Sequence, residues 1–317
     1  MKRGEVSTRS AGIDVSKATL DVALAERDER LQVSNTSAGL AELAMWLRGQ
    51  GVSRVGLEAS GGYERAAAEA LRAGGFEVVV HQPAEVRAFA KFKRIRAKND
   101  RIDAKVIALA TAQVEAVKAA NDPRLVELAE WFTAYEQAAD LVAQMKTCLE
   151  QVSIAPLRDG KLAQIRQLQL WKTQLLREIL KRIKAWPDLA RRYALLQSLP
   201  GCGAVVAACL LIRMPELGEL PRGCAASLIG VAPWDRDTGQ SSGKRRIGGG
   251  RARPRRMLYI AALAASRFDP GFRAFTQRLR AAGKAPKVAL AALMRKLIEA
   301  ANLILARRTP WLRAEAI

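Results

Sequence analysis

The chain has 317 residues, half of them hydrophobic, and its 52 Lys and Arg against 31 Asp and Glu give a formal net charge of +21. This length fits two or three domains, and the charge favours a polyanionic partner, with nucleic acid ahead of an anionic membrane surface. The single histidine and the four cysteines, which lack C-x-x-C spacing, exclude a zinc site built from about four closely spaced Cys or His ligands.

Neither a membrane span nor a secretory leader is expected. The uncharged residues 193–212 are interrupted by Gln197, Pro200 and Gly201, whereas a spanning helix needs about 20 mainly apolar residues. This segment is therefore predicted to be a loop that enters a buried helix. The N-terminus lacks the apolar run of a signal peptide. Scattered thiols are typical of a reducing compartment, so we expect a cytoplasmic protein.

The first third of the chain predicts an α/β domain with a mixed sheet, because three strands come first and later strands alternate with helices. The lone His81 follows the apolar run "FEVVV" and is interpreted as an ordinary strand-end residue. The expected elements are three strands within 10–36, a helix at about 38–49, a strand ending at Glu58, a helix from the Gly61–Gly62 turn to about 73, a strand "FEVVVHQ" closed by Pro83, and a helix from near Arg101 through "IDAKVIALATAQ".

The remainder reads as helical. Residues 163–185 are amphipathic and basic, which fits either a hairpin or coiled-coil arm that makes dimer contacts or a solvated helical linker. The turn "LPGCG" resembles one helix-hairpin-helix unit, whose backbone amides can hold a phosphate, although a glycine-rich helix entry also arises for steric reasons. Residues 286–308 predict an amphipathic helix with a core face. The predicted domains are 1–118, 119–194 and 195–317.

Four carboxylates are the candidate catalytic groups. Asp14 and Glu58 end the first and fourth strands, and Asp100 and Asp103 share a face at a helix start. Such a set suits Mg²⁺, which prefers oxygen ligands and, as a pair of ions about 3.5–4 Å apart, can clamp both oxygens in phosphoryl transfer. Capping by Asp100, a first-turn acid at Asp103 and a turn at Asp14 are the alternatives. Asp21 is expected to be structural or exposed.

Two basic segments are candidate nucleic-acid contacts, because Lys and Arg bind phosphates and glycine allows close backbone approach. The alternative for the second is a solvated loop. The first surrounds "KNDRIDAK" and contains Lys91, Lys93, Arg94, Arg96 and Lys98; the second surrounds Gly248–Gly250 and contains Lys244, Arg245, Arg246, Arg251, Arg253, Arg255 and Arg256.

Several stretches, taken together, resemble the DEDD-type insertion-sequence transposases of the IS-one-ten family, to which pilin-gene DNA invertases are related. They are "AGIDVSKATLDVAL", "GLEASGGYE", "KNDRIDAKVIA", "LPGCG" and "GVAPWDRDTGQSSGKRRIGGGRARPRRMLYIAAL". The resemblance runs nearly end to end and is weakest across about 120–195. It implies a RuvC-like domain of RNase H type at the N-terminus, a helical transposase domain at the C-terminus, and Asp14, Glu58, Asp100 and Asp103 as the Mg²⁺-binding tetrad.

The resemblance also implies a nucleophilic serine in a Ser–Gly dipeptide after the "AP" segment, where this chain reads Thr238–Gly239. We therefore expect Thr238 to be the nucleophile, with Ser241 as the alternate and Ser242 as a further hydroxyl nearby. The resemblance further implies a tetramer, assembled as a dimer of dimers, and a structured bridge RNA that pairs with donor and target DNA.

The expected function is a transposase or recombinase that excises and inserts a mobile element through a covalent hydroxyl–DNA intermediate. Two alternatives stay open. A RuvC-like structure-specific nuclease would use the same carboxylates with water as the nucleophile, and a decayed transposase would bind nucleic acid without cutting it.

Overall fold

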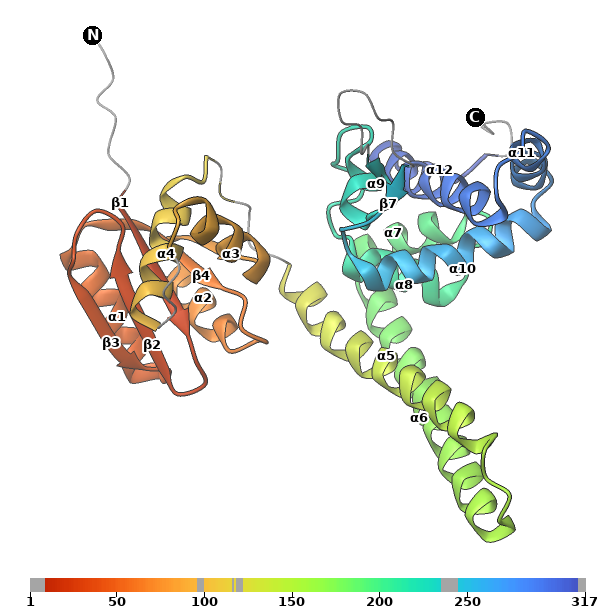
Figure 1. Cartoon of the computed structure of the whole chain (residues 1–317), viewed down its shortest axis with the longest axis horizontal. Coiled ribbons are helices and arrows are strands. Elements are labelled where there is room, and N and C mark those ends of the chain that lie inside the picture. The colour runs from red at the N-terminus through yellow and green to blue at the C-terminus, as the bar shows by residue number, and fades with distance from the viewer. Residues whose placement is uncertain (1–8, 96–99, 116, 118–121, 235–244, 313–317) are drawn as a thin grey trace. The chain divides into compact units, whose positions relative to one another are not determined.

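The computed structural model describes residues 9–95, 100–115, 117, 122–234 and 245–312, with Asp100 and Arg101 described by their backbone alone. The chain divides into two compact units, residues 1–120 and residues 121–317 (Figure 1). No helix of the described residues is long and apolar enough to cross a membrane.

The first unit is built on a five-stranded mixed sheet with the order β3-β2-β1-β4-β5. The first three strands form an antiparallel meander, and β4 and β5 run parallel to β1. This order is that of the RNase H-like folds, so the predicted mixed sheet is confirmed. The strands are β1 Arg9–Val15, β2 Thr19–Leu24, β3 Arg30–Ser34, β4 Val52–Glu58 and β5 Glu77–His81.

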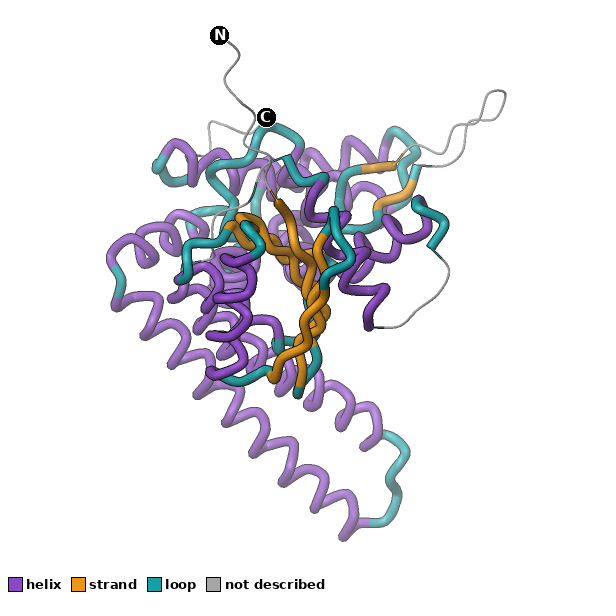
Figure 2. The backbone as a smooth tube through the Cα atoms, turned by 90° about the vertical axis from the view of Figure 1, so that its left-hand side faces the viewer, coloured by secondary structure: helices purple, strands orange, loops and turns teal. Residues whose placement is uncertain are grey.

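Helices cover the sheet on both sides, as Figure 2 shows. The helices α1 (Ser37–Gly49) and α2 (Glu64–Ala73) bury their apolar faces in the same core as the alternate residues Ile13 and Leu57. The helix α4 (Asp100–Ala112) covers the other face and has its most extensive contact with β1. Burial of this apolar surface on both sides is the main stabilising contribution to the unit.

Two glycines let α4 lie directly on the sheet. A Cβ atom on Gly12 of β1 would stand 2.1 Å from the backbone nitrogen of Ala108, and one on Gly56 of β4 would stand 1.8 Å from Thr111 Oγ1. A side chain on Gly12 would meet the backbone of α4, and one on Gly56 would displace the side chain of Thr111. Gly12 pairs with Gly56 across the two strands, so together they form a flat seat for α4.

Gly12→Ala is expected to lower the free energy of unfolding by about 3 kcal/mol or more, because the added methyl meets backbone atoms that cannot swing aside. Gly49→Ala is the matched control, since a Cβ on Gly49 meets nothing within 4 Å. Urea unfolding of the two full-length variants measures the difference. Equal stability of both variants would mean that α4 is not seated as described.

The helix α3 (Pro83–Phe92) corrects the sequence analysis, which gave these residues no helix and used Pro83 only to close β5. Proline is favoured at the first position of a helix, where its missing N–H needs no partner. The carboxylate of Glu85 accepts a hydrogen bond from the Gln82 backbone N–H at 3.0 Å, as in a capping box. Val86 of α3 then packs against Val106 and Ile107 of α4.

The second unit is helical, as predicted. Two long helices form an antiparallel hairpin, and one hydrophobic core joins its base to the remaining helices (Figure 1). This core contains residues from both sides of residue 194. The predicted domain boundary between residues 194 and 195 stays a prediction. The helices are α5 Pro123–Leu149, α6 Ala155–Ala185, α7 Pro187–Gln197, α8 Ala204–Arg213, α9 Cys224–Ile229, α10 Ala252–Phe268, α11 Pro270–Ala281 and α12 Pro286–Arg307, and a small ribbon joins β6 Pro233–Trp234 to β7 Arg246–Ile247.

Candidate functional site

The register of the central strands brings two of the predicted carboxylates together. Ile13 of β1 pairs with Leu57 of β4 in parallel, so the next residues, Asp14 and Glu58, lie side by side at the carboxyl ends of the strands. Side chains alternate between faces along a strand. Both acids therefore share the face of Gly12 and Gly56, which α4 covers, and both are half-buried. We call Asp14 and Glu58 the β1–β4 acid pair.

Polar residues also lie beside the β1–β4 acid pair on the two neighbouring strands, β2 and β5. Asp21 of β2 is the direct cross-strand partner of Asp14, and His81 of β5 is the partner of Glu58. Asp21 is half-buried and accepts a hydrogen bond from Gln32 Nε2 at 2.9 Å. Sequence reasoning set Asp21 aside as structural or exposed. The alternation in "TLDVAL" combined with the hairpin register is the signal that places it on the face of the acid pair.

The contacts of Lys105 and the geometry of a helix indicate on which flank of α4 Asp103 lies. Lys105 Nζ donates hydrogen bonds of 2.8 Å to the carbonyl oxygens of Leu24 and Arg27, beside the amino-terminal part of β1. Residues two apart on a helix project about 200° from each other. Asp103 therefore leaves α4 on the opposite flank, the side of the β1–β4 acid pair. Asp100 precedes it by one turn, and its side chain lies outside the described residues.

The carboxylates at this end of the sheet include two that suit a magnesium ion. In the part of the chain that the structure describes, no three His, Cys, Asp or Glu side chains lie close enough to hold a metal ion. Two adjacent carboxylates are nevertheless a common Mg²⁺ set, because this ion keeps several waters and takes substrate phosphates as further ligands. The β1–β4 acid pair meets that requirement, while the predicted four-carboxylate set stays a prediction.

His81 is an ordinary strand-end residue, as predicted. It is buried, and its Nε2 lies 2.9 Å from Thr111 Oγ1 of α4. Burial lowers the pKa of His81 below its ordinary value, and the charge of Glu85 opposes that shift weakly. Burial therefore favours the neutral form of the imidazole in the folded protein.

His81 is expected to make the fold acid-sensitive. Because its pKa is lower in the folded than in the unfolded chain, the unfolded chain binds the proton first, and stability falls as the pH drops through the unfolded value of about 6.5. The loss ends below the folded pKa. His81→Gln removes this contribution, and no other histidine exists to replace it. Thermal unfolding at pH 7.5 and 5.5 measures it, and identical pH profiles for both proteins would contradict it.

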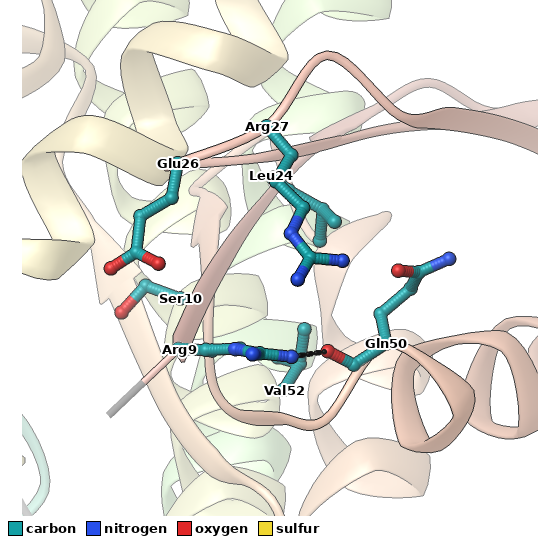
Figure 3. Close-up of a pocket in the computed structure, with 7 residues that line it drawn as sticks. All are labelled: Arg9, Ser10, Leu24, Glu26, Arg27, Gln50 and Val52. Carbon is teal, nitrogen blue, oxygen red and sulfur yellow. Dashed lines mark hydrogen bonds between the residues drawn. The ribbon is translucent and has the colours of Figure 1, made fainter. Parts of the chain in front are cut away.

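A small pocket lies at the opposite end of β1 and is not the candidate site. Figure 3 shows Arg9 and Ser10 among the residues that line it, with the Arg9 guanidinium donating to the Gln50 carbonyl at 3.0 Å. The hydroxyl of Ser10 is buried and has no hydrogen-bond partner among the described residues. The enclosed volume of about 10 Å³ holds at most one water molecule.

The first basic segment is exposed where it is described. Lys91 and Lys93 are exposed at the end of α3, and the ammonium of Lys93 lies 5.7 Å from the Phe89 ring centroid. Arg94 is also exposed and has a positive φ of 58°, an uncommon backbone state outside glycine. Arg96 and Lys98 lie outside the described residues. The predicted phosphate contacts of this segment stay a prediction.

The ribbon of β6 and β7 frames the segment that holds the predicted nucleophile. Trp234 pairs with Arg246, and its indole Nε1–H donates to the Gly248 carbonyl at 3.3 Å. Sequence reasoning missed both strands, because two residues each are too few to show alternation. Four predicted site residues lie between them, outside the described residues: Thr238, Ser241, Ser242 and Lys244.

Glycines of the second basic segment approach the protein's own backbone. Gly230 and Gly250 have positive φ values of 83° and 60°. A Cβ on Gly250 would stand 2.3 Å from the Gly230 nitrogen, and one on Gly230 would stand 2.2 Å from the Gly249 carbonyl oxygen. Their small size is therefore needed to close this turn, whereas the sequence analysis assigned Gly248–Gly250 to contact with a ligand.

Several arginines of the second segment are bound within the protein. The guanidinium of Arg251 forms two hydrogen bonds, of 2.8 and 2.5 Å, to the carboxylate of Glu216. Arg255 donates to the carbonyl oxygens of Gly230 and Gly249. These contacts stabilise the turn that precedes α10. Arg245 and Arg246 are exposed beside the ribbon.

A buried acid organises the junction of the arm and the C-terminal helices. Glu136 of α5 is only 5% exposed, and its Oε2 accepts from Arg213 of α8 at 2.8 Å and from Arg253 of α10 at 2.5 Å. A buried carboxylate requires such partners. Arg256 forms an exposed ion pair of 3.5 Å with Asp140.

The turn "LPGCG" joins α7 to α8 and rests on α10. Gly201 has a positive φ of 82°, and a Cβ there would stand 2.2 Å from the Ala261 carbonyl oxygen. The amides of Cys202 and Gly203 bond to the Leu199 and Gly201 carbonyl oxygens within the turn. The steric reason is therefore present for Gly201, whereas a Cβ on Gly203 would meet nothing within 4 Å. A phosphate contact of this turn stays a prediction.

Comparison with known proteins identifies the family. A transposase model of the IS110 (IS-one-ten) group matches residues 11–153, and the model "Transposase IS116/IS110/IS902 family" matches residues 193–277. The pilin gene-inverting proteins of Moraxella bovis and Moraxella lacunata are each 26% identical over 315 residues, covering 95% of this chain and 96% of the relative.

Two further matches are shorter or more distant. An uncharacterized 43.6 kDa protein of the insertion element IS110 from Streptomyces coelicolor is 34% identical over 105 residues, covering 32% of this chain and 26% of that protein. T. thermophilus RuvC in complex with a Holliday junction substrate has 16% identity and a TM-score of 0.28, covering 32% of this chain and 91% of that one. Since both family models describe one group and together span most of the sequence, the chain belongs to the IS110 family of transposases and is a DNA transposase or site-specific recombinase.

Proposed function

We propose that the chain cuts and rejoins the DNA strands of a mobile insertion sequence through a covalent protein–DNA intermediate. The β1–β4 acid pair is the observation that carries this proposal. Two carboxylates from strands about forty residues apart in sequence share one edge and one face of the sheet. Carboxylate oxygens gathered in this way are the ligands that a hard divalent cation prefers. A role in binding a cation explains them.

Magnesium is the proposed cofactor, held by Asp14 and Glu58 with Asp103 and Asp100 of α4. When bound there, it supplies Lewis-acid stabilisation of the charge on the reacting phosphate. The protein holds the carboxylate ligands in place. The register of β1 with β4 positions Asp14 beside Glu58, and the glycines Gly12 and Gly56 let α4 pack close to the sheet. The exposed cations Lys91, Lys93 and Arg94 bind the flanking DNA backbone.

Thr238 is the proposed nucleophile, with Ser241 as the alternate. Its hydroxyl oxygen attacks a DNA phosphorus, and the Thr–O–P bond forms as the bond from phosphorus to one DNA oxygen breaks. The hydroxyl loses its proton, and the released DNA oxygen takes up a proton and becomes a DNA hydroxyl. A hydroxyl of another strand then attacks the same phosphorus and restores the Thr238 hydroxyl. Neither step consumes water, so the strands exchange without net hydrolysis.

The proposed partners are donor and target DNA, a bridge RNA and further copies of the chain, as a tetramer of two dimers. The net charge of +21 supports polyanionic partners. The arm supports dimer contacts, because Leu157, Leu170 and Trp171 of α6 expose 57%, 66% and 43% of their surface. Such apolar side chains favour burial against another protein surface.

Covalent trapping tests the proposal. The full-length protein is incubated with Mg²⁺ and a duplex that carries the ends of the element, and the products are separated under denaturing conditions. A DNA-linked protein band is expected. Strand cleavage without any linked protein would instead show hydrolysis by water, and it would overturn the covalent mechanism while retaining the acid pair.

A further inference from the structure

The helix α11 and the first half of α12 form a strongly cationic hairpin. Between residues 270 and 298 there are seven Lys and Arg and no Asp or Glu. None of them belongs to the two basic segments considered above. Six gather at the seam and the tip of the hairpin and are called the α11–α12 cationic surface: Arg278, Arg280, Lys284, Lys287, Arg295 and Lys296.

The seam holds two cations over one aromatic ring. The ammonium of Lys296 on α12 lies 4.6 Å from the Phe275 ring centroid, and the guanidinium carbon of Arg278 on α11 lies 5.6 Å from it. Burial, and then the charge of Arg278, lowers the pKa of Lys296. The free protein therefore bears a repulsion here that an approaching anion would relieve.

The turn between α11 and α12, which is the tip of the hairpin, also carries positive charges without acids. Lys284 lies in the turn and Lys287 in the first turn of α12, whose N-cap residue Ala285 makes no side-chain hydrogen bond. The N-terminus of a helix carries a partial positive charge that acids there normally offset. Two lysines at this end raise the positive potential instead, which favours an anionic ligand.

Five of the six cations of this surface are available to a partner. Within the described residues, no carboxylate forms an ion pair with Arg278, Arg280, Lys284, Lys287 or Arg295. All five of these side chains are exposed. The contrast is with Arg251 and Arg253, which Glu216 and Glu136 bind inside the same unit.

The surface lacks the apolar anchors that a protein or a membrane would need. Among the described residues from 270 to 298, Val288 is the single large hydrophobic side chain that is exposed. Protein interfaces depend on buried aromatic and aliphatic anchors, and helices that lie on membranes insert bulky apolar residues. Cations separated by alanine and glycine suit a regular chain of phosphates instead.

We propose that the α11–α12 cationic surface binds the phosphate backbone of double-stranded DNA, independently of base sequence. The proposal rests on the DNA recombination function of the family and adds the surface that holds the duplex. Phosphate contacts fix the position of a protein on DNA without reading its bases. Arg280, Lys284 and Lys287 at the tip are its principal contacts.

The salt dependence of DNA binding tests this role. The variant carries Arg280→Gln, Lys284→Gln and Lys287→Gln, since glutamine preserves helix propensity. The matched control carries Arg166→Gln, Arg177→Gln and Lys181→Gln, three exposed cations of α6, so both proteins lose three charges. Full-length proteins are titrated against a random-sequence 30-base-pair duplex by fluorescence anisotropy over a range of salt concentrations.

The tip variant is expected to bind the duplex at least about tenfold more weakly near 0.15 M salt, and its log–log salt slope should fall by about 2 to 3. The control should stay within about twofold of the unmodified protein. Equal loss in both variants would attribute binding to net charge, and a loss for duplex RNA alone would assign the surface to RNA; either result overturns the proposal. Because binding is measured without strand exchange, failure of the covalent mechanism leaves this outcome unaffected.

Discussion

Asp14→Asn is expected to reduce strand exchange by about 100- to 1,000-fold while the protein still binds DNA. The substitution keeps the size of the side chain and removes the charge that the acid pair presents to a cation at the reacting phosphate. Loss of one strongly placed electrostatic group in an active site commonly costs two to three powers of ten, about 3–4 kcal/mol in the activation barrier. Recombination of a plasmid that carries the element ends measures the effect.

Asp28→Asn is the matched control, because Asp28 is exposed in the turn between β2 and β3. It should recombine as the unmodified protein does. Thermal unfolding of both variants shows whether the fold is retained. An Asp14→Asn protein that recombines at the normal rate would remove the cation-binding role of the acid pair and, with it, the proposed chemistry.

Thr238→Ala is expected to abolish the covalent protein–DNA adduct, whereas Thr238→Ser should retain or raise it. The alanine variant lacks the oxygen that attacks phosphorus, and serine offers the same oxygen without the methyl group that crowds the approach. Quantification of the DNA-linked band for each full-length variant is the measurement.

Ser241→Ala distinguishes the two candidate hydroxyls. This variant should form the adduct at the normal level if Thr238 is the nucleophile. An adduct that persists in Thr238→Ala and disappears in Ser241→Ala would transfer the role to Ser241. In both cases DNA binding should stay unchanged, since no charge is altered.

Strand ends were predictable because alternation and strand boundaries are local properties. The sequence placed Asp14 and Glu58 at the ends of two strands, and the observed register confirms both positions. The position of Asp21 beside Asp14 needed the hairpin register, which depends on the length of the turn between β1 and β2. Local patterns alone therefore gave two of the three acids on this face.

Long-range pairing was beyond the reach of the sequence. Glu136 and Arg253 are 117 residues apart, and nothing in either local pattern indicates that they meet. For this reason the arginines after Gly250 all read as phosphate contacts, although Arg251 and Arg253 form ion pairs within the protein. The four predicted residues between Trp234 and Arg245 lie outside the described residues, so their roles remain predictions.

The parallel pairing of β1 with β4 also constrains how this protein can evolve. The same alternation that sends Leu57 into the apolar layer sends Glu58 toward α4. Insertion or deletion of one codon within β4 would exchange the two, burying a charge among aliphatic side chains and placing a leucine in the position of the proposed cation ligand. Folding and chemistry would then fail at once, so we expect inherited length changes in relatives to fall outside this strand.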